Sequence, residues 1–148
     1  MPRRRLTAEE HVVRHCSNSK LMKRNGQVVG VFGEAFRLRS AEKYLSSTWF
    51  EYFTGSRQDR FVATIAALRG MPRDIKKKDG LVILSVNRLE ACGTARAAKI
   101  KCWHEPKPNN RAYAAIRGLP LKQDSDLMDL IAEEVAAADI AIVQDLEG

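Results

Sequence analysis

The stretch LVILSV, residues 81–86, decides the fold class of this chain. It is almost continuously apolar and rich in β-branched residues, which is typical of a strand buried on both faces. An Asp-Gly pair at 79–80 precedes it and favours a turn. The residues that follow, Asn87-Arg-Leu-Glu90, have the form of a capping box and predict a short helix that ends near Gly93. We therefore expect a central strand followed directly by a helix.

Further strands are predicted on both sides of this one. Apolar and polar residues alternate, or β-branched residues cluster, between turn-forming residues at 11–16, 27–32, 98–103, 112–116 and 138–143. Asn25-Gly26 separates two of these segments and predicts a tight turn, because both residues accept a positive φ. Residues 35–38 are expected to extend the strand at 27–32.

Two main helices are predicted, at 57–69 and 125–138. Ser56 and Asp59 form a capping box at the start of the first, and Gly70 follows its last residue. Ser125 is the expected cap of the second, which places apolar residues on one stripe and acids opposite. A third capping-box pattern, Thr48 to Glu51, predicts a helix that starts at Trp49.

Strands and helices interleave irregularly, and this pattern predicts an α+β fold. We expect a mixed or largely antiparallel sheet of about five to six short strands, packed with the two main helices. The chain has 148 residues, enough for one domain with a core of its own. We assign this domain to residues 11–148. Residues 1–10, which include Arg3, Arg4 and Arg5, are expected to form a flexible basic arm.

Composition excludes several classes of protein. No apolar run approaches the roughly 18–20 residues that span a bilayer. The charged start MPRRRLTAEE is not followed by the apolar stretch of a signal peptide. Cys16, Cys92 and Cys102 are odd in number and widely spaced, which argues against a disulfide framework and fits a reducing compartment. We expect a cytoplasmic protein that does not enter a membrane.

The net charge of +7 is unevenly distributed. Residues 1–80 contain 17 Lys and Arg against 8 Asp and Glu, whereas residues 81–148 contain 8 against 10. A basic front half and an acidic tail favour one surface that attracts polyanions and another that repels them. The alternative is that this asymmetry serves solubility alone.

The segment GEAFRLRSAEKYLSSTWFEYF, residues 33–53, concentrates aromatic, basic and acidic side chains and suggests a composite polar site shared with residues 102–113. Arginine can clamp phosphate, histidine and glutamate can transfer protons near neutral pH, and Trp can stack on a base. The candidate catalytic residues are His15, Arg39, Glu51, His104 and Tyr113. The candidate phosphate-binding residues are Arg3, Arg4, Arg5, Lys23, Arg24, Arg37, Lys76, Lys77 and Lys78, and the candidate stacking residues are Trp49 and Trp103. The alternative is structural, with Arg39 and Glu51 as an ion pair and the aromatic rings in the core.

No cofactor is predicted. Gly-rich nucleotide motifs of the G-x-G-x-x-G and P-loop types are absent, as is a G-x-S-x-G elbow. A mixed Cys/His zinc site could be assembled from residues 11–16 and 102–104 if these strands came together. No C-x-x-C or H-E-x-x-H spacing supports such a site, so we predict no bound metal.

These patterns predict a small basic intracellular protein that binds or acts on nucleic acid or a nucleotide. Its size and charge are typical of a toxin or defence component, with phosphodiester cleavage or nucleotide-group transfer as the chemistry, although the sequence alone leaves catalysis open. A second hypothesis is a noncatalytic adaptor or homodimer that docks a protein partner through residues 33–53 and the acidic helix 125–138.

A third hypothesis comes from the layout of residues 33–53: a basic extended segment, then aromatic residues with Leu-Ser, then a helix ending in glutamate. This layout resembles that of small ADP-ribosyltransferase-like toxins, which implies an NAD-using enzyme. The segment departs from the family pattern because it has neither a Ser-x-Ser nor a Glu-x-Glu pair.

Overall fold

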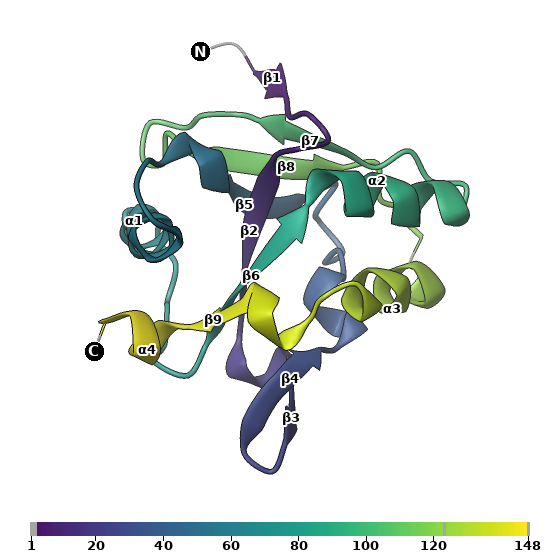
Figure 1. Ribbon diagram of the computed structural model, residues 1–148. Coiled ribbons are helices and arrows are strands. Elements are labelled where there is room, and N and C mark those ends of the chain that lie inside the picture. Colours follow the sequence, from purple (N-terminus) through teal and green to yellow (C-terminus); the bar gives the residue numbers. More distant parts are fainter. Residues whose placement is uncertain (1–2, 123, 148) are drawn as a thin grey trace.

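A seven-stranded antiparallel sheet organises the computed structural model, which describes residues 3–122 and 124–147 (Figure 1). Its strand order is β1-β7-β8-β5-β2-β6-β9. The strands are β1 (Arg4–Arg5), β2 (His11–Cys16), β5 (Leu45–Trp49), β6 (Gly80–Ser85), β7 (Lys101–His104), β8 (Tyr113–Arg117) and β9 (Ile140–Ile142). Strands β3 (Leu21–Arg24) and β4 (Gln27–Val31) form a separate two-stranded hairpin. The predicted α+β single domain is confirmed, with a larger sheet than expected.

The longest pairing in the sheet joins β2 to β6. It runs over six residue pairs, from His11 opposite Ser85 to Cys16 opposite Gly80. Successive side chains of a strand point to opposite faces, so Val12 and Val13 enter two different hydrophobic cores. Strand β6 is buried on both faces, as its sequence predicts. It is not at the centre of the sheet, however, but next to the edge strand β9.

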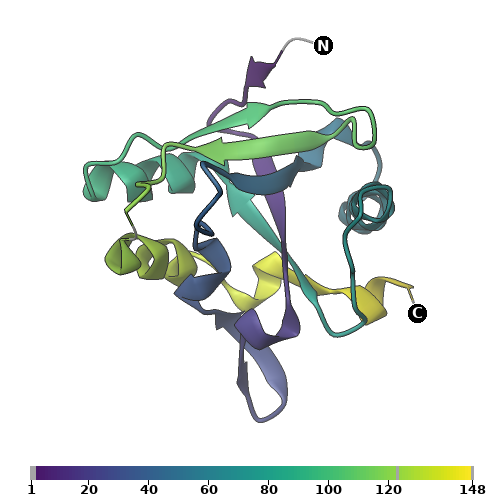
Figure 2. The ribbon, with the colours of Figure 1, turned by 180° about the vertical axis from the view of Figure 1, so that it is seen from behind.

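Helices cover both faces of this sheet (Figures 1 and 2). Helix α1 (Arg57–Arg69) and the short α4 (Val143–Glu147) pack on one face around Phe61, Ile65 and Val143. Helices α2 (Val86–Ala95) and α3 (Ser125–Glu133) pack on the other with the 3₁₀ turn η2 (Gly33–Phe36). No helix in the described part of the chain is long and apolar enough to cross a membrane.

Helix α1 has the predicted boundaries, and its capping box is formed. Ser56 Oγ accepts the Asp59 N–H at 3.1 Å, and the Asp59 carboxylate accepts the Ser56 N–H at 3.0 Å. The helix stops at Gly70, whose N–H bonds the Ala66 carbonyl. Local signals are sufficient here because all the groups that start and end the helix lie within the segment itself.

The other helix boundaries differ from the prediction. Helix α2 begins directly after β6 with Ser85 as its cap, and α3 is capped by Asp124 and ends at Glu133. Residues 137–139 then form a single 3₁₀ turn before β9. In each case a polar side chain one or more residues earlier than the predicted cap accepts the free helical N–H.

Two predictions within residues 33–53 are wrong. Residues 35–38 do not extend a strand, because Ala35 and Phe36 belong to η2 and are buried beneath α3. No α-helix starts at Trp49, which ends β5 and is followed by one 3₁₀ turn over Phe50–Tyr52. Pairing of β5 with β2 and β8 is what keeps Thr48 and Trp49 extended, overriding the local capping pattern.

The described part of the predicted basic arm lies on the sheet rather than loose. Arg4 and Arg5 form β1 opposite His104 and Trp103 of β7. Leu6 is 1% exposed, and its N–H bonds the Cys102 carbonyl at 2.9 Å. This one buried leucine anchors the segment, whereas residues 1–2 of the arm lie outside the described residues.

We predict that Gly118, directly after β8, is essential for stability. Its φ is +94°, and a Cβ built there would lie 1.9 Å from the Lys99 carbonyl oxygen. Gly118→Ala should therefore lower the free energy of unfolding by about 2 kcal/mol or more in urea denaturation. Gly30→Ala is the matched control, since no atom lies within 4 Å of that added Cβ. Equal stability of the two variants would contradict this prediction.

Candidate anion-binding cleft

A cleft of about 510 Å³ lies where β2 ends, next to the 3₁₀ turn η1 (Asn18–Lys20) and the segment after η2. Its lining is strongly basic. Five cationic side chains face it, together with His15 and a single carboxylate, Glu34. The five are Arg14, Lys20, Arg37, Arg39 and Arg73. We refer to it as the cationic cleft.

Arg14 lines the cationic cleft and is partly buried. Its Nε donates to the Ala35 carbonyl at 2.7 Å and its Nη1 to the Ser46 carbonyl at 2.9 Å. Both acceptors are neutral, and no described carboxylate forms an ion pair with Arg14. Burial lowers the pKa of this guanidinium, as expected for a charge held without a counterion. A partly buried cation of this kind favours an anionic ligand.

The positive charges of the outer side chains of the cationic cleft are also only partly neutralised by carboxylates. Lys20 and Arg37 share Glu34, at 3.9 and 3.6 Å, so one carboxylate serves two cations. Arg39 and Arg73 are not within ion-pair distance of any carboxylate in the described residues. The predicted pairing of Arg39 with Glu51 is therefore absent, and Arg39 remains available to a ligand.

His15 and Asp79 form a buried pair at the inner edge of the cationic cleft. His15 Nε2 lies 2.8 Å from Asp79 Oδ2, with the two side chains 10% and 4% exposed. The Asp79 carboxylate also accepts the Lys76 and Asn18 N–H groups, each at 3.0 Å. These contacts hold the ring and the carboxylate in fixed positions.

The two pKa values of this pair are both lowered. Burial, together with the positive charges of Arg73 and Arg14, lowers the pKa of His15 by more than the hydrogen bond and charge of Asp79 raise it. Burial acts in the opposite sense on Asp79, but hydrogen bonds from Lys76, His15 and Asn18 outweigh it and hold the pKa of the carboxyl low. The pair is therefore a carboxylate and a neutral imidazole at neutral pH. With Nε2–H donated to Asp79, the lone pair of His15 is on Nδ1, which can accept a proton.

The structure divides the predicted composite site into two groups. His15, Arg37 and Arg39 line the cationic cleft, and Tyr113 lies beside it, in contact with a small cavity that His15 also lines. Tyr113 OH is 2.8 Å from Ser46 Oγ, and the Lys107 ammonium lies over its ring. Tyr113 is thus positioned as a structural neighbour of the pair formed by His15 and Asp79.

Glu51 and His104 lie outside this cleft. Glu51 contacts His11 through both carboxylate oxygens, each at 2.7 Å. His104 Nε2 donates to the Arg111 carbonyl at 2.8 Å, and its ring packs against Trp49 at a centroid distance of 4.8 Å. These two residues are placed near the start of β2, whereas His15 is near its end.

An arginine side chain lies over the ring of each predicted stacking residue. Arg4 lies over Trp49 at 4.5 Å from the ring centroid, and Arg3 lies over Trp103 at 5.0 Å. A nucleic-acid base would have to displace these guanidinium groups before it could stack.

The predicted phosphate-binding residues other than Arg37 are spread over the molecule. Arg3, Arg4 and Arg5 belong to β1 and its approach, and each forms an ion pair with a glutamate. Lys23 and Arg24 are near the tip of the β3–β4 hairpin, at the opposite end of the molecule (Figures 1 and 2). Lys76, Lys77 and Lys78 lie in the loop before β6 and are exposed. These groups cannot all contact one short ligand.

The residues of the alternative zinc site are not gathered. Cys16 and Cys102 are buried in the core that α2 and α3 cover, and burial raises their pKa values to about 11 and about 12. His15 points to the opposite face and is occupied by Asp79. Within residues 3–122 and 124–147, no group of three or more His, Cys, Asp or Glu side chains is placed to hold a metal ion.

Sequence reasoning missed three residues of the cationic cleft and its surroundings: Arg14, Arg73 and Asp79. The sequence pattern of β2 could have identified Arg14. It is the fourth residue of the strand and shares a face with the buried second and sixth residues. The other two come from loops that reach His15 only through the pairing of β2 with β6. Their proximity is a tertiary effect with no local signature.

Acid should destabilise the protein partly through His15. Because its folded-state pKa is below the ordinary value of about 6.5, the unfolded chain takes up this proton at a higher pH. The contribution of neutral His15 is fully present above pH ~6.5 and is lost as pH falls through the folded-state pKa. His15→Gln should lose less stability than wild type from pH 7 to pH 5, by at most about 1.4 kcal/mol per pH unit in urea denaturation. Parallel pH profiles for the two proteins would refute this role for His15.

Comparison with known proteins adds no candidate. The chain matches no protein-family model, no curated protein and no solved structure.

Proposed function

We propose that the protein binds the phosphate groups of a nucleotide or nucleic acid strand in the cationic cleft. The observation that carries this proposal is the partly buried Arg14 guanidinium, which has only neutral carbonyl partners and lines the cleft. Removing a cation from water without a counterion is costly. An anion bound in the cleft would act as the counterion of Arg14 and offset this cost. Arg39 and Arg73 provide further positive charge at the same cleft.

Phosphate suits this cleft better than an isolated carboxylate. Four of its five cationic side chains are arginines, whose planar forks match phosphate oxygens with two parallel hydrogen bonds. The combined charge exceeds what one carboxylate would neutralise, whereas a di- or triphosphate or successive phosphodiesters would balance it. A volume of about 510 Å³ is within the range of small-molecule and cofactor sites.

His15 supplies a reactive group to the proposed ligand. Its neutral ring, oriented by Asp79, can accept a proton from a hydroxyl group or a water molecule next to a bound phosphate. Phosphodiester cleavage or transfer of a nucleotide-derived group is the chemistry that this arrangement would support. In that role Arg14 and Arg39 would stabilise the negative charge that develops on the phosphate.

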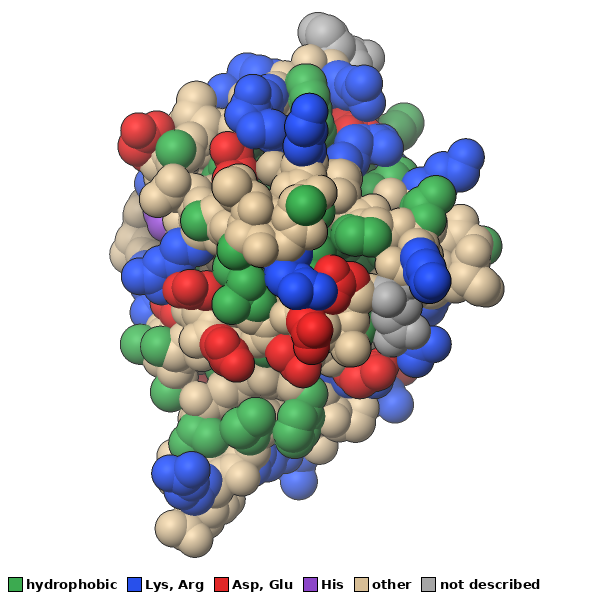
Figure 3. All heavy atoms as spheres, turned by 90° about the vertical axis from the view of Figure 1, so that its right-hand side faces the viewer, with side chains coloured by type: hydrophobic (Ala, Val, Ile, Leu, Met, Phe, Trp, Pro, Cys, Tyr) green, Lys and Arg blue, Asp and Glu red, His purple; other side chains and the backbone are tan. Residues whose placement is uncertain are grey.

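The distribution of charge supports a defined binding surface. Figure 3 shows acidic side chains gathered across the face over α3, with basic side chains above them and at the margins. Asp126, Asp129 and Glu133 are exposed on this helix. A polyanion would be repelled from that face and directed toward the basic parts of the surface.

The binding of a labelled single strand should be strongly salt-dependent and should depend on Arg39. Neutralising one side chain that contacts a phosphate reduces the steepness of log affinity against log salt by about 0.7 for single strands. Arg39→Gln should reduce the slope by about that amount in fluorescence anisotropy from about 50 to 200 mM salt. Lys99→Gln removes the same charge from an exposed position outside the cleft and should leave the slope unchanged.

Parallel titrations distinguish the forms of the ligand. Short RNA, single-stranded DNA, duplex DNA, ATP and NAD are compared under the same conditions, NAD being included as the ligand of an ADP-ribosyltransferase-like enzyme. Binding that Arg39→Gln weakens and Lys99→Gln does not supports the cleft, and the probe that binds most tightly identifies the ligand class. The proposal is overturned if no probe binds at low salt, or if the two variants lose affinity equally.

A further inference from the structure

A second cleft, at the opposite end of β2, is lined by a histidine and a serine, and the histidine is held by a glutamate outside the lining. The phosphate-binding proposal does not use these residues. The cleft has a volume of about 420 Å³ and wraps around the edge of β6 beyond the end of β9. His11 and Ser85 both line it. We call it the β6-edge cleft.

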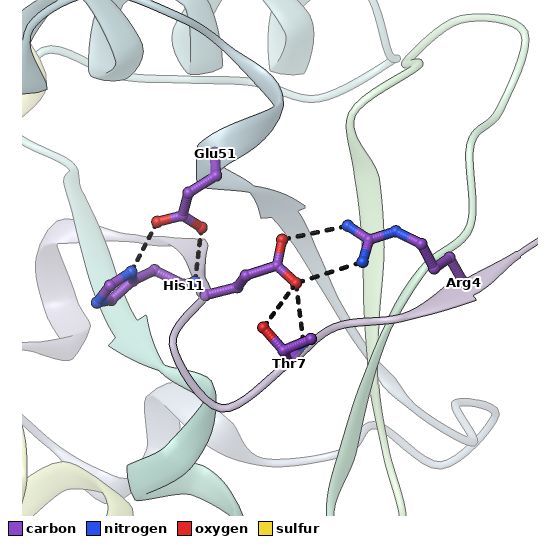
Figure 4. A network of polar contacts seen from close by, with 5 residues as sticks. Arg4, Thr7, His11 and Glu51 are labelled. Carbon is purple, nitrogen blue, oxygen red and sulfur yellow. Dashed lines mark hydrogen bonds and ion pairs between the residues drawn. The ribbon is translucent and has the colours of Figure 1, made fainter.

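Glu51 orients the ring of His11 (Figure 4). Glu51 Oε1 accepts the backbone N–H of His11 at 2.7 Å, and Oε2 lies 2.7 Å from His11 Nδ1. Two contacts from one carboxylate fix the ring and place its proton on Nδ1. The lone pair of a neutral His11 is therefore on Nε2, the atom directed away from Glu51.

A neighbouring network holds the chain that leads into His11. Glu10 Oε1 accepts the Thr7 N–H at 2.8 Å and the Thr7 hydroxyl at 3.1 Å, and Arg4 pairs with Glu10 at 3.2 Å (Figure 4). The Glu10 carbonyl in turn accepts the Val86 N–H at 3.0 Å. These bonds join the start of β2 to the start of α2, so His11 is held relative to Ser85 as well as to Glu51.

Ser85 is directly opposite His11 in the pairing of β2 with β6. Opposed residues on antiparallel strands share a face, with Cβ atoms about 4.5–5.5 Å apart. Ser85 is the last residue of the strand and the cap of α2, and its Oγ accepts the Arg88 N–H at 3.4 Å. This contact uses the hydroxyl as an acceptor and leaves its proton to be donated.

Two further features of the β6-edge cleft suit a carbonyl compound. The first-turn N–H groups of α2 lack intrahelical acceptors and provide positive potential next to Ser85 Oγ. The floor is apolar, formed by Leu89, Cys92 and Ile131. The two flanking arginines donate to backbone carbonyls, Arg57 to that of Ala138 and Arg88 to that of Glu134.

We propose that Ser85, His11 and Glu51 catalyse hydrolysis of an ester or thioester of a small apolar acid bound in the β6-edge cleft. The Ser85 hydroxyl transfers its proton to His11 Nε2 while Oγ bonds to the acyl carbon. The bond from that carbon to the leaving oxygen or sulfur breaks, and His11 returns the proton to the leaving group. Water then attacks the acyl-serine with His11 as base, which releases the acid and restores Ser85.

No sequence motif predicts the grouping of Ser85, His11 and Glu51. His11 and Glu51 are 40 positions apart, Glu51 and Ser85 are 34 apart, and Ser85 is not in a G-x-S-x-G elbow. Strand pairing alone brings Ser85 to His11, and the 3₁₀ turn after β5 brings Glu51.

The test combines a serine-reactive fluorophosphonate probe with hydrolysis of p-nitrophenyl butyrate by the full chain. Peptide mapping should find the probe on Ser85. Ser85→Asp is the main variant, because aspartate remains a good helix cap while the nucleophile is removed. It should melt like wild type, bind no probe at residue 85 and hydrolyse the ester at least tenfold more slowly.

Glu51→Gln should slow both labelling and hydrolysis at least tenfold while retaining the folded circular-dichroism spectrum. Ser46 provides a matched internal control, since its hydroxyl also lies next to a histidine-lined cavity but is held by Tyr113 at 2.8 Å. The proposal is overturned if the probe labels Ser46 or no serine, or if folded Ser85→Asp or Glu51→Gln retains wild-type turnover. Phosphate binding in the cationic cleft is measured independently, so either proposal can fail alone.

Discussion

The pairing of β2 with β6 is the constraint on which the rest of the structure depends. Its six-residue register sets which side chains of β2 face α1 and which face α2 and α3. A slip of one residue would invert this arrangement, moving His11 and His15 into an apolar core and Arg14 to the opposite face. The buried valines at positions 12 and 13, one for each core, make such a slip costly and so stabilise the register.

The same register gives two histidines on one strand two different surroundings. His11 and His15 share a face of β2, yet each meets its own carboxylate, Glu51 at the start of the strand and Asp79 near its end. His15 is almost enclosed, whereas 39% of the His11 side chain is exposed. Acid–base function depends on such differences in burial and partner rather than on residue type, so the two sites can serve distinct chemistry.

Sequence patterns were most reliable where the deciding groups are close together in the chain. Helix α1 follows from Ser56, Asp59 and Gly70, and β6 follows from its own continuous apolar run. The capping pattern at Thr48 to Glu51 misled because strands on both sides hold those residues extended. For the candidate sites, residue types were identified better than partners: His15 and Arg39 were selected without Asp79, and Glu51 was assigned to the wrong companion. Partners across strands depend on register, which no local pattern encodes.

The cationic cleft is also where the protein departs from the arrangement that would stabilise it most. Several arginines elsewhere are paired with carboxylates: Arg117 donates two hydrogen bonds of 2.7 and 2.8 Å to Glu105, and Arg4 pairs with Glu10. Leaving Arg14 with neutral acceptors and gathering other cations around it raises the energy of the folded state through repulsion and desolvation. The binding of an anion in the cationic cleft, as proposed, would relieve this electrostatic strain.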